Sequence, residues 1–391
     1  MIGISKLLGG TENFGDRLRY VEGARHQQYG VSPLKGPVVV WNCTNTCNLS
    51  CKHCYADSKP CQFEEELNTK EAKALIEDLG AFKVPVLLIS GGEPLLRKDL
   101  FDLIRHASDN QIRSTISTNG TLIDKAVAKD LKQNGVGYVG ISLDGIGERN
   151  DAFRGAQGSF DKAVAGIRNC LDIGQRVGLR FTINRNNYDE LEDLFHLIKE
   201  EGIPRVCFYH LAYSGRGSSM IHEDITHEET RAAMDLIIQK AIELKDKVEI
   251  LTVDNHADAP YLYLQAKAKY PELADNIWRL LQMNGGNRSG MAIANIDFKG
   301  NVHADQFTQH HTFGNIRDRK FSSIWKYPEN PIAIDLRERK SLLKGRCNVC
   351  QWLSICNGNL RVRAEAITGD FWMPDPACYL TDEEIGGGQS L

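Results

Sequence analysis

The sequence Cys47-Asn-Leu-Ser-Cys51-Lys-His-Cys54-Tyr55 lies just after an apolar run at residues 38–41. Three cysteines at spacings of four and three residues suit three irons of one cubane iron–sulfur cluster. Such clusters are normally held by four cysteine thiolates. A compact set of three therefore leaves one iron open for a ligand from outside the protein. The alternatives are a zinc site and a structural cluster with a distant fourth cysteine.

The composition and net charge of the chain exclude several classes of protein. The chain has 391 residues, of which 42% are hydrophobic and 25% charged, as is typical of a globular protein with ample core. A net charge of −4 indicates neither a nucleic-acid surface nor a polybasic membrane patch. No apolar run reaches the about 18 residues of a membrane-spanning helix, and the first ten residues lack a signal-peptide pattern. We therefore expect a cytoplasmic protein with no nucleic-acid partner and no membrane span.

The chain contains eleven cysteines, and in this setting they indicate metal binding before disulfides. Cys43 and Cys61 flank the first group and are weaker competitors for iron. Cys170 and Cys207 are interpreted as small buried hydrophobic residues. The other seven fall into two groups, Cys47, Cys51 and Cys54 near the start and Cys347, Cys350, Cys356 and Cys378 near the end.

Short apolar strands alternate with amphipathic helices between residues 37 and 211. Helix patterns at 69–82 and 98–109 lie between strands, and Asn68 or Thr69 can cap the first of them. Six strand–helix units predict parallel strands with right-handed crossovers, which gives a partial (β/α)6 TIM-like barrel open at one side. The expected strands are 38–43, 84–90, 112–117, 137–143, 177–183 and 205–211.

Polar residues follow the strands, where such a barrel carries its chemistry. After the second strand, Gly91 and Gly92 permit close backbone approach, and the Glu93 carboxylate can accept from a ligand ammonium. A guanidinium suited to a carboxylate comes from Arg154. Hydroxyl, amide and carboxylate groups follow the third and fourth strands at Ser117, Asn119, Ser142 and Asp144.

The alternation of strands and helices ends after residue 211. A glycine–serine loop at 214–219 precedes helix patterns at 228–245 and 259–283, with a strand at 248–253 between them. A second glycine-rich loop spans 284–290, and strands at 292–298 and 301–307 form a hairpin through Lys299-Gly300. We divide the chain into a leader (1–36), a barrel (37–211), a helical connecting region (212–290) and a C-terminal cluster domain (291–391).

Four cysteines in the C-terminal region suit one complete 4Fe-4S cluster with no open iron, and a four-cysteine zinc site is the alternative. The three-cysteine loop together with Gly91-Gly92-Glu93 resembles the radical S-adenosylmethionine (SAM) superfamily. The hairpin and terminal cysteines resemble its C-terminal SPASM or "twitch" extension. The full form of that extension has further cysteines where this chain has 304–306 and 357–359, so one auxiliary cluster is expected.

The resemblance implies a role for each candidate residue. Cys47, Cys51 and Cys54 would hold a 4Fe-4S cluster whose open iron binds SAM, and reduction would give a 5′-deoxyadenosyl radical. Glu93 and Arg154 would bind the methionine ammonium and carboxylate of SAM. Ferredoxin or flavodoxin is the expected electron donor. The ribose and methionine would be contacted by residues among Ser117, Asn119, Ser142 and Asp144.

Further motifs resemble the tetrapyrrole-modifying members of this superfamily: 39–42, 209–211, 284–287, 303–305 and 356–359. This likeness implies heme biosynthesis by removal of two acetate side chains from 12,18-didecarboxysiroheme, giving iron-coproporphyrin III. Heme d1 biosynthesis, acting on propionate chains, is the first alternative. A peptide-modifying enzyme and a non-catalytic electron carrier are the others. Candidate contacts to the iron tetrapyrrole are Arg216, Arg288, His210, His303, His310 and His311.

Overall fold

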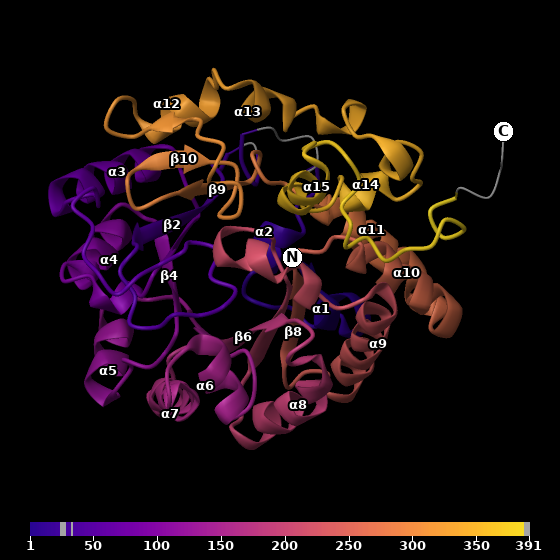
Figure 1. The fold of residues 1–391 in the computed structure, drawn as a ribbon, viewed down its shortest axis with the longest axis horizontal. Coiled ribbons are helices and arrows are strands. Elements are labelled where there is room, and N and C mark those ends of the chain that lie inside the picture. Colours follow the sequence, from indigo (N-terminus) through magenta and orange to yellow (C-terminus); the bar gives the residue numbers. More distant parts are fainter. Residues whose placement is uncertain (24–28, 33, 387–391) are drawn as a thin grey trace.

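The structure is a computed structural model that describes residues 1–23, 29–32 and 34–386. A single 11-stranded sheet curves through the molecule in the order β1-β8-β7-β6-β5-β4-β3-β2-β9-β10-β11. Its central strands are parallel, and helices cover their outer side (Figure 1). The expected partial barrel is confirmed. Its six strands are β2 (Val38–Thr44), β3 (Val86–Gly91), β4 (Arg113–Thr118), β5 (Val139–Ser142), β6 (Val177–Ile183) and β7 (Arg205–His210).

The outer helices form where the sequence places apolar residues at three- and four-residue intervals. Asn68 caps α3, and Glu71 completes a capping box by accepting from the backbone of Asn68. The helices of the barrel are α3 (Thr69–Ala81), α4 (Leu100–Asp109), α5 (Lys125–Gln133), α6 (Glu148–Arg154), α7 (Ser159–Asp172) and α8 (Leu191–Glu200).

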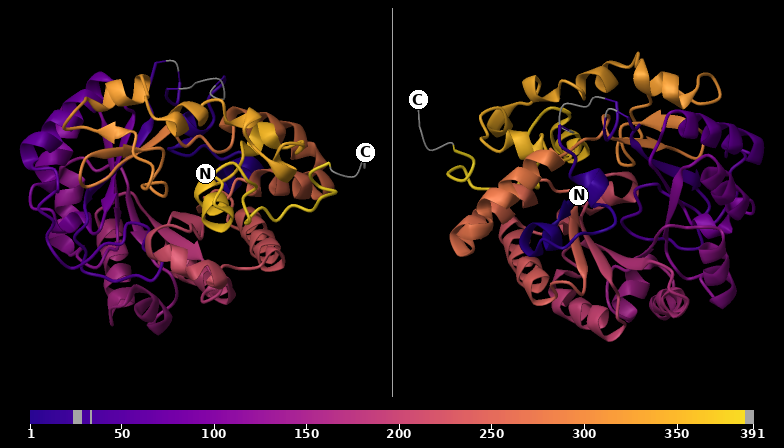
Figure 2. Two further views of the ribbon diagram at one scale, coloured as in Figure 1. Left: turned by 45° about the horizontal axis from the view of Figure 1, so that its top comes forward. Right: turned by 180° about the vertical axis from the view of Figure 1, so that it is seen from behind.

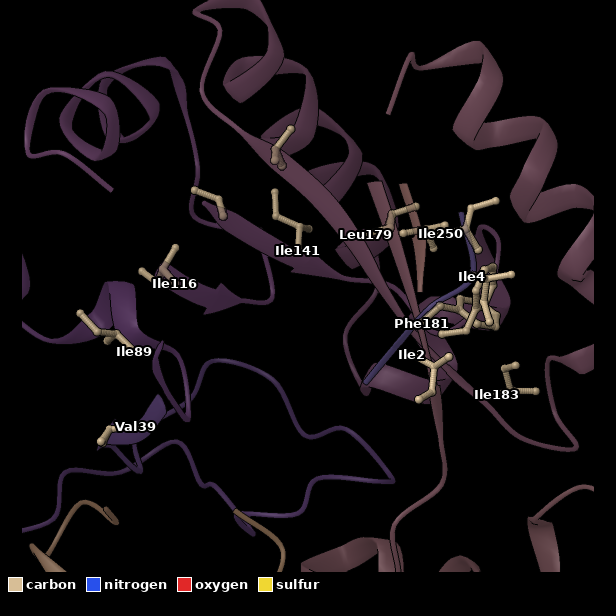
Figure 3. Close-up of a cluster of buried hydrophobic side chains, with 14 of the residues drawn as sticks. Ile2, Ile4, Val39, Ile89, Ile116, Ile141, Leu179, Phe181, Ile183 and Ile250 are labelled. Carbon is tan, nitrogen blue, oxygen red and sulfur yellow. The ribbon is translucent and has the colours of Figure 1, made fainter. Parts of the chain in front are cut away.

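Alternation along the strands divides the molecule into a dry outer core and an inner cavity wall. In β6, Leu179, Phe181 and Ile183 are buried in the main hydrophobic cluster, which also includes residues of the outer helices. Figure 3 shows this layer, with side chains from neighbouring strands side by side. The intervening residues of β6, Arg180 and Thr182, line a cavity inside the barrel.

The region after β7, which was predicted to be a helical connection, also adds a strand to the barrel sheet. β8 (Glu249–Val253) lies parallel to β7, so the sheet continues beyond the six expected strands. The single helix expected at 259–283 is wrong. The segment forms two helices, α10 (Asp258–Lys269) and α11 (Ala274–Asn284), with Pro271 between them. The helix breaks there because proline cannot donate the backbone hydrogen bond that a helix interior needs. The long helix α9 (His227–Glu243) begins at a second capping box formed by Thr226 and Glu229.

Strands from the N-terminal and C-terminal parts of the chain form the two edges of the sheet. β1 (Ile2–Gly3) pairs antiparallel with β8, and α1 (Ile4–Gly9) packs against β8 and α9. At the opposite edge, β9 (Ile293–Ile296) pairs parallel with β2, and β10 (Asn301–His303) and β11 (Gly314–Asn315) follow. Figure 2 shows the indigo N-terminal helices near the middle of the molecule. The other described α-helices are α2 (Asp16–Arg19), α12 (Phe321–Lys326), α13 (Pro331–Asp335), α14 (Leu353–Cys356) and α15 (Arg361–Thr368).

The four-region division remains a prediction, and the sheet crosses two of its boundaries. β8 lies in the expected connecting region, and β9 lies in the expected C-terminal domain, yet both pair with barrel strands. Parts of the leader (24–28 and 33) and of the C-terminal region (387–391) lie outside the described residues.

Candidate active site

The three-cysteine loop follows β2 and is fixed by backbone hydrogen bonds to distant segments. The amide of Cys47 donates to the carbonyl of Lys59 at 3.0 Å, and that of Lys52 donates to Phe153 at 3.0 Å. Nε of Arg216 donates to the carbonyl of Cys51 at 2.9 Å. The cysteine loop is thus held by two segments that are distant in sequence, α6 and the segment after β7.

The thiols of this loop lie where a bare thiolate is disfavoured. Burial raises the pKa of the Cys47 thiol to about 12 and that of Cys51 to about 11. Bound metal reverses this preference, because a coordinating thiol is deprotonated. Among the described residues, neither cysteine group brings three sulfur atoms within 4.8 Å of one another. Tetrahedral zinc would place them about 3.8 Å apart. The three thiols of the loop are the type of donor that an iron–sulfur cluster takes.

The Gly-Gly-Glu turn packs directly on the start of the cysteine loop. A Cβ at Gly91, whose φ is +136°, would lie 2.1 Å from the carbonyl oxygen of Thr44, and one at Gly92 would lie 2.1 Å from that of Thr46. The amides of Gly92 and Glu93 donate to these same two carbonyls at 2.8 Å. Glycine is needed at both positions because any side chain would force the turn and the loop apart.

The Glu93 carboxylate is fully buried and already accepts three hydrogen bonds. They come from the Thr118 hydroxyl at 2.7 Å, the Asn119 amide at 2.8 Å and the Leu95 amide at 3.1 Å. Burial raises the pKa of Glu93 against the effect of these donors. Glu93 has no exposed surface, and neither it nor Gly91 or Gly92 lines the cavities described below. The expected contact between Glu93 and an ammonium group stays a prediction. In the structure, the Glu93 carboxylate joins the end of β3 to the end of β4.

A cavity inside the barrel collects some of the expected SAM contacts. Ser142, Asp144 and Arg154 line it. Nη2 of Arg154 donates to Asp144 in a buried ion pair. Burial lowers the pKa of Arg154, but Asp144 and the Cys51 thiol outweigh burial and raise it. The other candidates do not line this cavity: Asn119 donates to Asn48 of the cysteine loop at 2.8 Å, and Ser117 is half-buried in β4.

A second cavity adjoins the first on the side of the leader and the C-terminal region. Its walls are mostly apolar and include Leu18 and Val31 of the leader, Arg288 and Leu360. The leader therefore covers one side of the barrel interior. The two cavities share Val40, Leu88, Arg180, Tyr209, Asp254, Gln306 and Phe307.

Most of the remaining polar candidates have structural partners. Arg216 holds the cysteine loop, and His303 uses both ring nitrogens, toward the His311 carbonyl (3.0 Å) and Asp297 (3.4 Å). His310 and His311 share the carboxylate of Glu365. Only His210 of these lines the inner cavity, and its Nε2 lies 3.0 Å from the buried carboxylate of Asp258.

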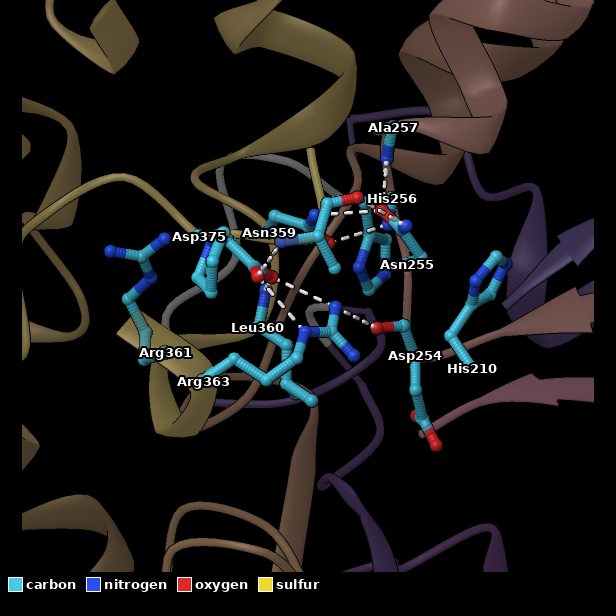
Figure 4. Close-up of polar contacts among 12 residues, drawn as sticks. His210, Asp254, Asn255, His256, Ala257, Asn359, Leu360, Arg361, Arg363 and Asp375 are labelled. Atoms are coloured by element: carbon cyan, nitrogen blue, oxygen red, sulfur yellow. Dashed lines mark hydrogen bonds and ion pairs between the residues drawn. The ribbon is translucent and has the colours of Figure 1, made fainter. Parts of the chain in front are cut away.

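Arg180 and Asp254 line both cavities and were not predicted from the sequence. Arg180 had a signal, because it is a charged residue within the otherwise apolar run of β6, on the face that alternates away from the core. Asp254 follows β8 directly and has a φ of +69°, an uncommon conformation for a residue other than glycine. Its backbone carbonyl accepts from Arg363 at 2.6 Å, and its side chain points away from that contact (Figure 4).

We expect the Asp254→Asn variant to be more stable than the wild type at pH 8. Burial raises the pKa of Asp254 from 3.8 to about 6. The stability contributed by the protonated form is present below the unfolded pKa and is lost as the pH rises through about 6. At pH 8 the charged carboxylate then costs roughly 2–3 kcal/mol, which asparagine removes without strain, since it tolerates positive φ. Urea unfolding at pH 5 and pH 8 measures this; an equal gain at both values would contradict it.

The C-terminal cysteines form a second group of partly buried thiols. Burial raises the pKa of all four, and Cys356 is raised further by its neighbours Cys378, Cys347 and Cys350. The effect of the other three on the pKa of Cys356 indicates that the four thiols lie near one another, although Cys347 and Cys378 are 31 residues apart in sequence. Cys43, Cys170 and Cys207 are buried, and Cys61 is exposed.

No helix in the described part of the chain is long and apolar enough to cross a membrane. A family model for the radical SAM superfamily matches residues 41–213. Streptococcus suis SuiB bound to S-adenosylmethionine superposes with a TM-score of 0.70 at 18% identity, covering 92% of this chain and 79% of SuiB, which shows a shared fold. The chain belongs to the radical SAM superfamily and is a radical SAM enzyme. Membership implies SAM and a 4Fe-4S cluster as cofactors.

Two relatives extend the likeness over nearly the whole chain. Fe-coproporphyrin III synthase of Methanosarcina barkeri is 52% identical over 395 residues, covering 99% of both chains. Pre-heme d1 synthase of Dinoroseobacter shibae is 45% identical, covering 90% of this chain and 88% of that protein.

Proposed function

We propose that this enzyme acts in heme biosynthesis and removes two acetate side chains from 12,18-didecarboxysiroheme, giving iron-coproporphyrin III. The observation that carries the proposal is the 52% identity to Fe-coproporphyrin III synthase over 99% of both chains. The 45% identity to pre-heme d1 synthase favours the second candidate, which is removal of propionate chains from the same tetrapyrrole in heme d1 biosynthesis.

The residues of the cysteine loop and its surroundings have the chemistry this reaction needs. Cys47, Cys51 and Cys54 would hold the 4Fe-4S cluster, and Gly91, Gly92, Glu93, Ser117, Asn119, Ser142, Asp144 and Arg154 are the proposed SAM contacts. When bound, cluster and SAM together supply a 5′-deoxyadenosyl radical that takes a hydrogen atom from the substrate. The Asp144–Arg154 ion pair lines the cavity. The Gly-Gly-Glu turn is fixed to the cysteine loop by the backbone hydrogen bonds described above. These contacts favour a fixed ligand geometry.

The two adjoining cavities support a tetrapyrrole as substrate. Such a ligand is a broad apolar ring system edged by carboxylates, so it needs apolar walls with a few cationic groups. The second cavity has mostly apolar walls and carries Arg180 and Arg288. Burial lowers the pKa of Arg288 to about 10, so this guanidinium is still charged at neutral pH.

We also propose an auxiliary 4Fe-4S cluster held by Cys347, Cys350, Cys356 and Cys378, reduction by ferredoxin or flavodoxin, and a cytoplasmic location. The clustering of four partly buried thiols supports the auxiliary cluster. The Cys350→Ser variant is expected to lose about four irons per chain and most product formation, while still releasing 5′-deoxyadenosine. Iron analysis and product quantification test this; normal product yield from an iron-depleted variant would contradict a role in turnover.

The function itself is tested by anaerobic incubation of the reconstituted enzyme with SAM, dithionite and 12,18-didecarboxysiroheme. Mass spectrometry of the product distinguishes loss of two acetate groups from loss of two propionate groups. Release of 5′-deoxyadenosine that depends on the tetrapyrrole supports the proposed reaction. Absence of any change in the tetrapyrrole, with SAM cleavage intact, would show that this is not the substrate.

A further inference from the structure

Arg180 reaches into the barrel at the junction of the two cavities. It belongs to β6, on the face opposite to the buried residues Leu179 and Phe181, and it lines both cavities. Its side chain passes over Gly140 of the neighbouring strand β5. A Cβ at Gly140 would lie 2.8 Å from Cδ of Arg180, so the glycine leaves the space that the arginine stem occupies. The absence of a side chain at Gly140 thus leaves room for the arginine to extend into the barrel.

The guanidinium rests on an aromatic ring and forms no ion pair in the described part of the chain, although its charge offsets part of the burial that raises the pKa of Asp254. Its Cζ lies 4.6 Å from the centroid of the Tyr209 ring. Among the described residues, its side chain makes neither a hydrogen bond nor an ion pair, although the Asp254 carboxylate lines the same cavity. By contrast, Arg154 is paired with Asp144, and Arg205, over the ring of Tyr138, lies 3.3 Å from Glu249.

The free donors of Arg180 face open space. A guanidinium carries five N–H donors, and leaving them both buried and unpaired is costly. None of the nitrogen atoms of Arg180 is among the fully buried, unpartnered side-chain atoms of the described residues. They are therefore accessible from the cavity. A planar fork of donors, held over an aromatic ring in an enclosed space, is suited to a carboxylate, which it can bind through two parallel hydrogen bonds.

We propose that Arg180 binds a carboxylate of the tetrapyrrole substrate where the SAM-side cavity meets the apolar cavity. This inference rests on the proposed function. It assigns to Arg180 the recognition of one acidic side chain, close to the cavity wall formed by Ser142, Asp144 and Arg154. The arginine is a binding residue that holds one edge of the macrocycle, because its guanidinium would pair with one of the carboxylates that surround the ring.

The test compares four proteins: the wild type, Arg180→Gln, Gly140→Ala and Arg176→Gln. Gly140→Ala retains the guanidinium but pushes its stem aside. Arg176→Gln is the matched control, since this exposed arginine precedes the same strand and lies 4.1 Å over the ring of Phe14, outside both cavities. Dissociation constants are measured anaerobically on the reconstituted enzymes for 12,18-didecarboxysiroheme, iron-coproporphyrin III and SAM, at low and high salt.

We expect Arg180→Gln to weaken binding of 12,18-didecarboxysiroheme by about 10- to 100-fold, the usual range for losing a hydrogen-bonded charge partner. Gly140→Ala should weaken it less, and Arg176→Gln should not change it. The salt dependence of tetrapyrrole affinity should be smaller in Arg180→Gln than in the wild type, and the SAM dissociation constant should be unchanged. A loss for 12,18-didecarboxysiroheme alone identifies the bound group as an acetate, and a loss for both tetrapyrroles identifies it as a propionate.

The outcomes separate this inference from the function on which it rests. Equal affinities of Arg180→Gln and the wild type for both tetrapyrroles would overturn the role of Arg180 and leave the proposed function standing. Parallel losses of tetrapyrrole and SAM affinity with an unchanged salt dependence would also overturn it, since they indicate a general distortion of the barrel. Failure of the wild type to bind either tetrapyrrole would overturn the proposed function together with this inference.

Discussion

The Cys51→Ala variant is expected to lose all SAM cleavage and about four irons per chain, while the barrel stays folded. Cys51 is one of three thiols in a loop that is held by backbone hydrogen bonds and by the side chain of Arg216. Removing one of three ligands leaves a second iron without a thiolate, and burial of the remaining thiols then favours their neutral form. Iron and sulfide analysis, with quantification of 5′-deoxyadenosine after reduction by dithionite, measures the effect.

The matched control is Cys61→Ala. This cysteine is exposed and lies beyond the loop, so its removal should change neither the iron content nor the rate of SAM cleavage. A Cys61→Ala variant that lost its iron would mean that Cys61 competes for the cluster. Wild-type release of 5′-deoxyadenosine from Cys51→Ala would refute the assignment of the cluster to this loop.

The second large effect is expected at Arg363, whose buried guanidinium connects three parts of the chain. It forms an ion pair with Asp375 at 2.8 Å, and both side chains are fully buried. It also donates to the carbonyls of Leu211, after β7, and Asp254, after β8, at 3.0 and 2.6 Å. Figure 4 shows the contacts to Asp375 and Asp254, with Asp375 accepting from the amide of Leu360 as well. Asp375 raises the pKa of Arg363, although burial opposes it.

Replacement by Leu is expected to lower the free energy of unfolding by about 3–5 kcal/mol, because it leaves Asp375 as an uncompensated buried charge. The control is Lys344→Ala, which breaks an ion pair to Asp370 in which the lysine side chain is 55% exposed, so its expected cost is much smaller. Urea unfolding of the reconstituted proteins at pH 7 compares them. Similar losses in the two variants would show that the buried pair does not link the C-terminal region to the barrel.

The fold was largely readable from the sequence because its parallel strands are continuous apolar runs. The strand at residues 177–183 was predicted at its observed bounds, and the others differ by one or two residues at an end. The helix expected at 259–283 failed because the apolar repeat continues on both sides of Pro271, so periodicity alone could not show the break. The joining of β9 to β2 could not be seen either, since it pairs segments more than 250 residues apart.

The candidate site was readable only where its chemistry is local in sequence. The three cysteines lie within one stretch of eight residues, and Gly91-Gly92-Glu93 are consecutive. By contrast, two of the three hydrogen-bond donors to Glu93, Thr118 and Asn119, come from the end of the next strand. Arg180 and Asp254 are isolated polar residues whose importance depends on which face of the barrel they occupy. That face is decided by pairing with neighbouring strands, which no short motif encodes.

The parallel pairing of β9 with β2 has a practical consequence for anyone who recombines these enzymes. The strand that precedes the cysteine loop is flanked on one side by β3 and on the other by a strand from beyond residue 290. A fragment ending near residue 213 would expose that edge to unwanted association. Chimeras that exchange C-terminal extensions between relatives should therefore place the crossover after β11, so that each recipient retains its own sheet edge beside its SAM-binding loop.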